Sequence, residues 1–416
     1  MRTILQNGNV FTECGLLAMD IAICGDRLIA PFHQKDINHQ KDKIFELKNK
    51  LILPGFVDVH VHFREPGFLY KESIKTGSMS AVTGGFTTVF TMPNVNPPPS
   101  DYSSLKKQLD IIERDALVNV IPFGSITANQ SGRGDLSKME EISPHVAGFS
   151  DDGVGVQDEE LMEKAMREAQ RLGKVISAHC EDEMLNDTPY IGTSALSESG
   201  QAKRDILLVK KTGCKYHICH VSSKETVDAI REAKSEGIDI SCETAPHYIV
   251  FSEENIRREG RFKMNPPIRT ELDRQAIIEG IADGTIDMIA TDHAPHSFAE
   301  KTKGFEESAF GVVGLETAFS AIYTYLVAEG IISLDRLVEL MSIAPRKHFN
   351  LGGEYIENGT TADITVVDLT EEWTVDSAAF KTKGRATPFE GFKLKGKPYA
   401  TFVKGELVYF DGEIVR

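Results

Sequence analysis

Residues 55–67 read GFVDVHVHFREPG. Alternate side chains of an extended strand share a face, so His60 and His62 point the same way and Val59 and Val61 point the other way. Buried imidazoles need a hydrogen bond or a metal ion to offset their lost hydration. This stretch taken alone therefore leaves two interpretations open: two satisfied core histidines, or a pair of metal ligands.

Strand-like runs recur through the middle of the chain, with helix-patterned segments between most of them. The runs are LILPGFVDVHVHF, TTVFTMPN, NVIPFGSIT, VAGFSDDG, KVISAHCED, KYHICHVSS, IDISCETAPHY and TIDMIATDHAPH. The segments 158–173, 225–237 and 271–284 have helical patterning and end in glycine, as helix C-termini prefer. This alternation predicts an α/β protein with a parallel (β/α)8 barrel. A doubly wound open sheet is the alternative, but no glycine-rich phosphate loop follows any strand.

The two ends of the chain have a different texture from the middle. Both consist of short extended segments broken by turn pairs such as NG, GD and DG. We therefore expect a small β-sandwich domain formed by both termini, residues 1–52 and 351–416, with the barrel at residues 53–350.

Composition narrows the class of partner. The 416 residues carry a formal net charge of −16, whereas nucleic acids and anionic membranes call for clustered Lys and Arg. No stretch approaches the ~20 apolar residues of a membrane span, and the N-terminal segment has no secretory signal pattern. The six cysteines lack the spacing of a disulfide framework. We expect a cytoplasmic protein that acts on a small molecule, with no nucleic-acid or membrane partner.

Nearly every predicted strand ends in a polar residue with usable chemistry. These residues are His60, His62, Asn94, Asp151, Asp152, His179, His220, His247, Asp292 and His296. The C-terminal strand ends of a (β/α)8 barrel form its active-site face, so these side chains should converge. Imidazole and carboxylate ligands without thiolate suit Zn²⁺ or a similar ion in a catalytic site. The combination favours metal binding for the His-x-His pair.

Several motifs together closely resemble the dihydroorotases of the amidohydrolase superfamily. They are GFVDVHVHFREPG, FTTVFTMPNVNPPP, SAHCED, CHVSS, MNPPIR and TDHAPH, and the resemblance covers essentially the whole chain. It points to the bacterial class in which an Asp stands where relatives use a carboxylated Lys. The resemblance implies reversible cyclisation of N-carbamoyl-L-aspartate to L-dihydroorotate in de novo pyrimidine biosynthesis, with one or two Zn²⁺ ions per subunit, two being favoured. It also implies a homodimer and association with aspartate transcarbamoylase.

The resemblance assigns a role to each matching residue. The implied metal ligands are His60, His62, Asp152, His179, His220 and Asp292, with Asp152 as the bridge and Asp292 also as the catalytic general base and acid. The implied substrate contacts are His62, Arg64, Asn94, Asn265, His296 and the backbone of Phe310 and Gly311. Arg64 has a planar fork that suits a carboxylate, and its alternative is a surface ion pair with Glu65 or Glu72.

Strand alternation supports part of this assignment and leaves part of it open. It places His220 with Tyr216 and His217 with Cys219, so we expect His220 in the site and His217 as a structural histidine. Alternation does not choose between Asp151 and its neighbour. The stretch CKYHICH also suggests a compact Cys/His zinc site, but its ligands would point to both faces of the strand.

The chain departs from the family pattern after His179. The segment between SAHCED and CHVSS is shorter than usual and lacks an Arg-Pro, which predicts altered metal occupancy, oligomer contacts or pocket shape. Hydantoinases and allantoinases are the nearest rivals, but they bridge their metals with a carboxylated Lys, which VAGFSDDG lacks. A non-catalytic dihydroorotase-like scaffold subunit would have lost metal ligands, and here every position is filled.

Overall fold

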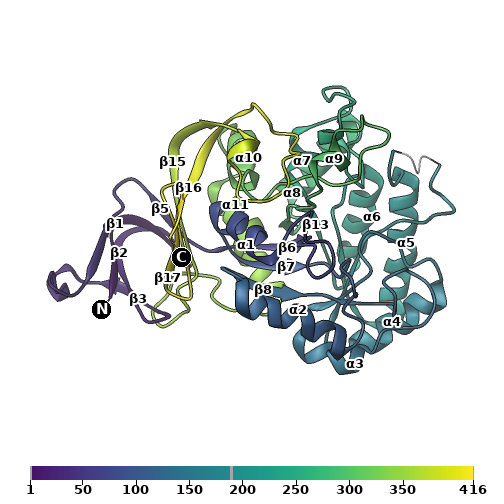
Figure 1. The fold of residues 1–416 in the computed structure, drawn as a ribbon, viewed down its shortest axis with the longest axis horizontal. Helices are drawn as coiled ribbons and strands as arrows, with labels where there is room; N and C mark the ends of the chain where they lie inside the picture. Colours follow the sequence, from purple (N-terminus) through teal and green to yellow (C-terminus); the bar gives the residue numbers. More distant parts are fainter. Residues whose placement is uncertain (1, 188–190, 416) are drawn as a thin grey trace.

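Strands from the two ends of the chain join one sheet in the computed structural model, which describes residues 2–187 and 191–415 (Figure 1). The order is β18-β17-β16-β15-β5-β1-β2-β3, with β4 paired to β1. The N-terminal strands are β1 (Thr3–Thr12), β2 (Gly15–Cys24), β3 (Arg27–Phe32), β4 (Lys43–Glu46) and β5 (Leu51–Pro54). The C-terminal strands are β15 (Ile364–Thr374), β16 (Lys393–Val403), β17 (Glu406–Phe410) and β18 (Glu413–Ile414). The two halves meet where β5 pairs antiparallel with β15.

The terminal sheet has a hydrophobic core of its own. Phe45 on β4 lies 6.0 Å from Phe402 on β16 and 5.4 Å from Phe410 on β17, measured between ring centroids. Aromatic pairs at such separations stabilise a core beyond the area that they bury. Strands from both ends therefore pack together as a β domain, as predicted. The domain limits at residues 52 and 350 stay a prediction.

Between the terminal halves lie two parallel sheets, of six and three strands. Figure 1 shows helices beside the strands of this part of the chain. The strands are β6 (Phe56–Val61), β7 (Phe86–Thr91), β8 (Asn119–Pro122), β9 (Gly124–Ser125), β10 (Gly148–Ser150), β11 (Val175–Ala178), β12 (Lys215–Ile218), β13 (Ile240–Thr244) and β14 (Met288–Ile289). Only Phe123 separates β8 from β9, so the two form one interrupted barrel strand. A parallel bridge between Val61 and His293 closes the ring, which confirms the (β/α)8 barrel over an open sheet.

Helices follow most of the barrel strands. They are α1 (Ile74–Thr83), α2 (Tyr102–Asp115), α3 (Met139–Ile142), α4 (Glu159–Arg171), α5 (Ala195–Thr212), α6 (Lys224–Ser235), α7 (Pro246–Val250), α8 (Glu271–Asp283), α9 (Phe298–Lys301), α10 (Ala318–Ile322), α11 (Leu334–Val338) and α12 (Ala344–His348). The three helices predicted from the sequence correspond to α4, α6 and α8. Thr270 caps α8 in a reciprocal capping box, and Gly284 ends it with a φ of 88°. Within the described ranges, no helix has the length and apolar character that a membrane crossing requires.

The run LILPGFVDVHVHF is divided between the two parts of the fold. Residues 51–54 form β5 of the terminal sheet, and residues 56–61 form the first barrel strand. Gly55 separates them, and a Cβ atom on it would lie 2.2 Å from Thr87 Oγ1. Only glycine fits this close approach. The chain therefore passes at Gly55 from the terminal sheet into the barrel strand β6, which contains His60 and is followed by His62.

Candidate active site

Four histidines and two aspartates meet at the C-terminal ends of the barrel strands, and all six are buried. They are His60 and His62 from β6 and the residue after it, Asp152 after β10, His179 after β11, His220 after β12 and Asp292 after β14. Parallel strands bring their carboxyl ends to one face of the barrel, which is why residues far apart in the sequence converge here. The structure thus brings together every residue that the sequence analysis proposed as a metal ligand.

Asp152 lies at the centre of this group. Its Oδ1 is 3.3 Å from both His60 Nε2 and His220 Nε2, and its Oδ2 is 3.4 Å from His62 Nε2. His179 Nδ1 is 3.8 Å from the same Oδ1. Burial raises the pKa of the Asp152 carboxyl, but the charge of His60 and a hydrogen bond from His220 lower it well below its usual value. The carboxylate is therefore ionised and faces all four histidines.

Asp151 points elsewhere. Its Oδ1 accepts a hydrogen bond of 2.8 Å from the backbone N–H of Ile126, and its Oδ2 accepts one of 3.0 Å from Gly132. Thr127 donates to it through both backbone and hydroxyl. Burial raises the pKa of Asp151 to about 6, although these hydrogen bonds act to lower it. Of the two aspartates, between which strand alternation left the choice open, Asp152 faces the histidines and Asp151 does not.

Asp292 completes the group on the side of β6. Its Oδ1 lies 3.0 Å from His62 Nε2 and 3.6 Å from His60 Nε2. Burial raises the pKa of Asp292, but the hydrogen bond to His62 and the charges of His60 and His62 prevail and lower the pKa to about 2. Asp292 is thus a carboxylate at neutral pH, which is the form that can accept a proton.

Three site residues have left-handed backbone conformations. The φ angles are 58° at Arg64, 34° at His220 and 45° at Asp292. Such conformations cost non-glycine residues energy, and they cluster at functional sites where the surrounding fold enforces them. Each follows the end of a strand, so the turn redirects a side chain toward the site.

The left-handed turn at His220, and not strand alternation, brings this histidine into the candidate site. β12 ends at Ile218, and His220 enters the site because its backbone leaves the strand geometry. Tyr216 lies on the helix side of the strand, where its hydroxyl donates to Asp205 at 2.6 Å. His217 faces the barrel interior, with its Nε2 3.1 Å from Glu243 Oε2. The assumption that His220 shares a face with Tyr216 is therefore wrong.

The donor atoms fit a divalent metal ion. Ligand atoms of His60, His62 and Asp292, and those of His60, Asp152 and His220, lie within 4.8 Å of one another. His60 Nε2 and His220 Nδ1 are buried nitrogens without a hydrogen-bond partner. Buried polar atoms are normally paired, so the unpaired Nε2 of His60, 3.3 Å from Asp152 and 3.6 Å from Asp292, indicates a missing partner. Nitrogen and oxygen donors of this kind suit Zn²⁺.

A cavity of about 220 Å³ opens beside these residues. The predicted substrate contacts that line it are His62, Arg64, Asn94, Asn265, His296, Phe310 and Gly311. The structure therefore collects the whole predicted set at one cavity.

Arg64 is buried at the cavity wall, and in the described parts of the chain no carboxylate pairs with it. Its Nε donates to the carbonyl of Pro295 at 3.3 Å, and its Nη2 is 3.4 Å from His296 Nε2. The alternative partners have other contacts. Glu65 accepts a hydrogen bond from the Ile74 backbone N–H, and Glu72 accepts one from the Thr382 hydroxyl. The surface ion pair is therefore wrong, and guanidinium donors remain for a ligand.

The other predicted substrate residues are partly occupied within the chain. Asn94 Oδ1 is 2.8 Å from His62 Nδ1, and His296 Nε2 is 2.7 Å from the Phe310 carbonyl. The amide side chain of Asn265 accepts from Thr193 and donates to Glu181. The backbone N–H of Gly311 donates to the Lys263 carbonyl at 3.0 Å, and a Cβ there would lie 2.6 Å from Ala294 O. Glycine is required for this close approach.

Sequence reasoning missed three charged residues that hold site side chains. Glu181 Oε2 is 2.9 Å from His179 Nε2, Glu243 Oε1 is 2.6 Å from His60 Nδ1, and Lys71 Nζ is 3.1 Å from His296 Nδ1. The signal for both glutamates was available: each is an acidic residue at the end of an apolar strand, as the predicted ligands are. Lys71 gave no comparable signal, because it lies in a loop.

The shortened segment after His179 contacts a residue of the cavity wall, since the Thr193 backbone N–H donates to Asn265 Oδ1 at 2.6 Å. Thr193 Oγ1 donates to Glu181 Oε2 at 2.7 Å, and Asn265 Nδ2 donates to the same oxygen at 3.1 Å. Residues 188–190 of this segment lie outside the described residues. Its predicted effect on metal occupancy stays a prediction.

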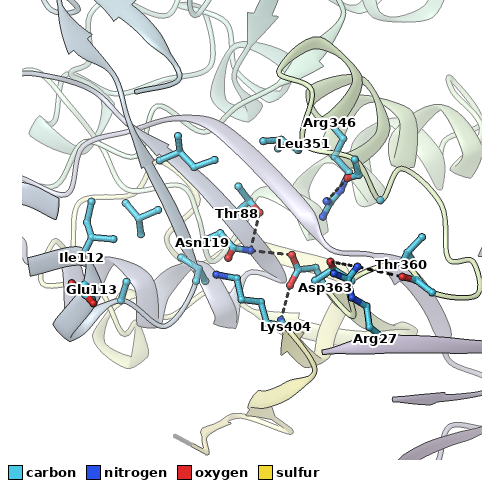
Figure 2. A pocket seen from close by; sticks show the side chains of 18 residues that line it. Arg27, Thr88, Ile112, Glu113, Asn119, Arg346, Leu351, Thr360, Asp363 and Lys404 are labelled. Atoms are coloured by element: carbon cyan, nitrogen blue, oxygen red, sulfur yellow. Dashed lines mark hydrogen bonds between the residues drawn. The ribbon is translucent and has the colours of Figure 1, made fainter. Parts of the chain in front are cut away.

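A larger cavity, of about 910 Å³, lies where the terminal sheet meets the barrel, and none of the predicted site residues lines it. Figure 2 shows Asn119, Asp363 and Lys404 gathered on its wall. Asn119 donates to Asp363 at 2.9 Å, and the Lys404 backbone N–H donates to the other carboxylate oxygen at 2.7 Å. The acidic group is thus satisfied by the chain itself. The candidate metal ligands and the predicted substrate contacts lie at the smaller cavity.

Comparison with known proteins agrees with this geometry. Residues 51–408 match the amidohydrolase family. A dihydroorotase of Fusobacterium nucleatum is 43% identical over 99% of this chain and 100% of its own length, and one of Geobacillus thermodenitrificans is 42% identical over 98% and 99%. Among solved structures, an L-hydantoinase of Arthrobacter aurescens superposes with a TM-score of 0.91 at 25% identity, covering 100% of this chain and 97% of its own. A dihydropyrimidinase of Brevibacillus agri gives 0.89 at 21%, covering 100% and 96%, which is a likeness of fold. The chain belongs to the amidohydrolase family.

Proposed function

We propose that the protein interconverts L-dihydroorotate and N-carbamoyl-L-aspartate, the ring-closing direction serving pyrimidine biosynthesis. The observation that carries this function is its identity of 40–43% with dihydroorotases along the whole chain. The site adds chemistry that suits this reaction. It has four histidines and two aspartates, Asp152 among them, beside a cavity lined by an arginine that, within the described residues, has no carboxylate partner.

We infer that one or two Zn²⁺ ions, two being favoured, occupy the carboxylate–histidine cluster. His60, His62 and Asp292 would hold one, His179 and His220 the other, with Asp152 between them. When bound, such ions lower the pKa of a water molecule towards ~7 and polarise a carbonyl group. The unpaired Nε2 of His60, beside Asp152 and Asp292, supports this assignment.

Asp292 is the proposed proton carrier of the reaction. As an ionised carboxylate it accepts the proton of the attacking water, and it then delivers that proton to the ring nitrogen as the amide bond breaks. Without that proton the amide nitrogen is a very poor leaving group. In the closing direction the same carboxylate removes the proton from the attacking nitrogen.

Arg64 would bind the carboxylate of the substrate through its planar fork, with Asn94 and His296 beside it. Burial and, to a smaller extent, the charge of Arg64 lower the pKa of His296 to about 3, so this imidazole is neutral. A neutral ring beside a guanidinium leaves the positive charge to Arg64. Asn265 and the backbone of Phe310 and Gly311 are the proposed neighbours of the ring amide groups.

Hydantoin or allantoin hydrolysis is the second candidate, because one solved structure with this fold, 25% identical, is an L-hydantoinase. Asp152 stands at the centre of the site, where those families have a carboxylated Lys. Arg64 lines the cavity, and it favours a substrate that carries its own carboxylate. A non-catalytic scaffold role is disfavoured because all the proposed ligands are present.

We also propose a homodimer, association with aspartate transcarbamoylase and a cytoplasmic location, as the family resemblance implies. Six free cysteines, four of them buried, support a reducing compartment. Size-exclusion chromatography with light scattering, alone and with the transcarbamoylase added, tests the assembly.

The deciding experiment is an assay of metal-replete protein with three cyclic amides. Dihydroorotate should open at alkaline pH, and carbamoyl-aspartate should close at acidic pH. Turnover of hydantoin or allantoin without dihydroorotate turnover would contradict the proposal. Inactivity towards all three substrates, with metal bound, would favour the scaffold role.

A further inference from the structure

Glu243 is a buried carboxylate shared by two histidines of the barrel interior. It belongs to β13, and only 1% of its surface is exposed. Its Oε1 lies 2.6 Å from His60 Nδ1, and its Oε2 lies 3.1 Å from His217 Nε2. The backbone N–H of His220 approaches the same Oε1 at 3.4 Å. One side chain therefore joins β6, β12 and β13 behind the candidate metal ligands.

Glu243 contacts no other basic side chain. In the described portion of the chain it pairs with no lysine or arginine, only with His60 and His217. Both of its oxygens lie at hydrogen-bond distance from a ring nitrogen. A carboxylate only accepts hydrogen bonds, so both ring nitrogens that face it carry hydrogen.

A histidine that binds a metal ion is neutral, and in a neutral His60 the hydrogen on Nδ1 leaves the lone pair of the ring on Nε2. This is the buried nitrogen without a hydrogen-bond partner, and it lies 3.3 Å from Asp152 and 3.6 Å from Asp292. A histidine binds a metal through its unprotonated nitrogen, and a carboxylate on the other nitrogen fixes the tautomer and the ring orientation.

We propose that Glu243 is a positioning residue of the metal centre, which holds His60 so that Nε2 is presented to the ion. This inference rests on the proposed metal-dependent function. It adds to that function a residue that touches neither the ion nor the substrate.

Glu243 is itself held from the opposite side of the barrel. His217 Nδ1 is 2.7 Å from Ser241 Oγ, which is 3.0 Å from His348 Nε2 on α12. Burial lowers the pKa of His348 to about 3, so this ring is neutral and can donate from Nε2. One consistent direction of donation then runs from His348 through Ser241 and His217 to Glu243. The carboxylate thus has a fixed position before any ion binds.

The test is the Zn²⁺ affinity of Glu243→Gln, measured by chelator competition without substrate. An amide offers one oxygen and one NH₂ group, so it cannot accept from both histidines. Loss of such an orienting carboxylate typically weakens metal binding by ~10–100-fold, and we expect a loss in that range. The visible absorption spectrum of the Co²⁺-loaded protein should also change, because the orientation of His60 changes.

Glu316→Gln is the matched control. Glu316 is also buried, and it accepts from the backbone N–H groups of Lys381 and Thr382 and from the Ser80 hydroxyl, away from the metal residues. This variant should melt earlier but should keep wild-type Zn²⁺ affinity and the wild-type Co²⁺ spectrum. A stability effect is thereby separated from a positioning effect.

The inference is overturned if folded Glu243→Gln binds Zn²⁺ with an affinity within about threefold of wild type. Such a loss would be far smaller than the loss expected for an orienting carboxylate. If that variant does not fold, Glu243→Asp decides by the same threshold, since it keeps the charge but is too short to reach both histidines. A wild-type protein that holds no Zn²⁺ would instead refute the metal site of the proposed function. Wild-type Zn²⁺ binding without dihydroorotate turnover would refute only the substrate assignment.

Discussion

Asp151 and Asp152 are adjacent in the sequence, but their carboxylates point into different environments. Asp152 lies within 3.8 Å of four histidines, whereas Asp151 accepts backbone hydrogen bonds from Ile126, Thr127 and Gly132. Two groups of the same chemistry therefore have different expected roles, one in metal binding and one in folding.

Asp152→Ala should release at least one equivalent of metal and leave essentially no turnover. A carboxylate that touches both ions holds them at the ~3.5–4 Å separation that two-metal hydrolysis uses. Asp151→Ala should keep its metal and melt earlier, because three backbone donors lose their acceptor. Elemental analysis and thermal melting of both variants check this. A metal-poor Asp151→Ala with a metal-replete Asp152→Ala would reverse the assignment.

Asp292→Asn should abolish turnover while the barrel stays folded. An amide cannot accept the proton of the attacking water, and it is also a poorer metal ligand. Circular dichroism and thermal melting separate lost chemistry from lost structure, and metal analysis shows how much of the effect comes from the ligand role. Activity within about tenfold of wild type would contradict Asp292 as the base, since general bases contribute ~10²–10⁴-fold.

The barrel and the convergence of the site were predictable from periodicity. Apolar runs that end in His, Asp or Asn place those residues at one face once the strands are parallel, which is how Asp152 and Asp292 meet His60. The terminal β domain was predictable for a similar reason, because turn pairs punctuate both ends of the chain.

Details that depend on single backbone conformations were not predictable. His220 reaches the site through a left-handed turn, with a φ of 34°, that strand alternation does not encode. The run through Gly55 reads as one strand because nothing local marks the crossing, which depends on the distant Thr87. Glu243 was missed for another reason. Its role appears only when β6 and β12 are brought against β13.

Lys301 should make stability depend on pH above neutrality. Its ammonium group is buried and donates to the carbonyls of Lys263 and Ala309 at 2.9 and 2.7 Å. Burial lowers its pKa from 10.5 to about 7, with the charge of Lys263 adding to the effect. Between these values the unfolded chain binds a proton that the folded chain has lost, so the free energy of unfolding rises with pH.

Lys301→Met removes this dependence. The stability of wild type relative to the variant should increase by roughly 2 kcal/mol from pH 7 to pH 9, because one pKa unit corresponds to about 1.4 kcal/mol. Denaturant unfolding of both proteins at equal metal content measures the difference. Curves that stay parallel over this range would show that Lys301 keeps an ordinary pKa.

Arg64→Lys should weaken substrate binding far more than conservation of charge suggests. A lysine cannot form two parallel hydrogen bonds with a carboxylate. A charge-assisted hydrogen bond contributes about 1.5–3 kcal/mol, so KM for dihydroorotate should rise roughly tenfold to hundredfold. The melting temperature should change little, because Arg64 has a single backbone acceptor, Pro295.

Arg346→Lys supplies the opposite pattern as a control. Arg346 is equally buried, and it donates to the carbonyls of Gly55 and Gly352 at the far end of the barrel. Its replacement should lower the melting temperature and leave KM unchanged. Arg64→Lys should instead raise KM and change the melting temperature little. Steady-state kinetics and thermal melting of both variants give the comparison. An unchanged KM in Arg64→Lys would mean that this arginine only supports the loop at Pro295, and the substrate carboxylate would then have to be bound by another residue.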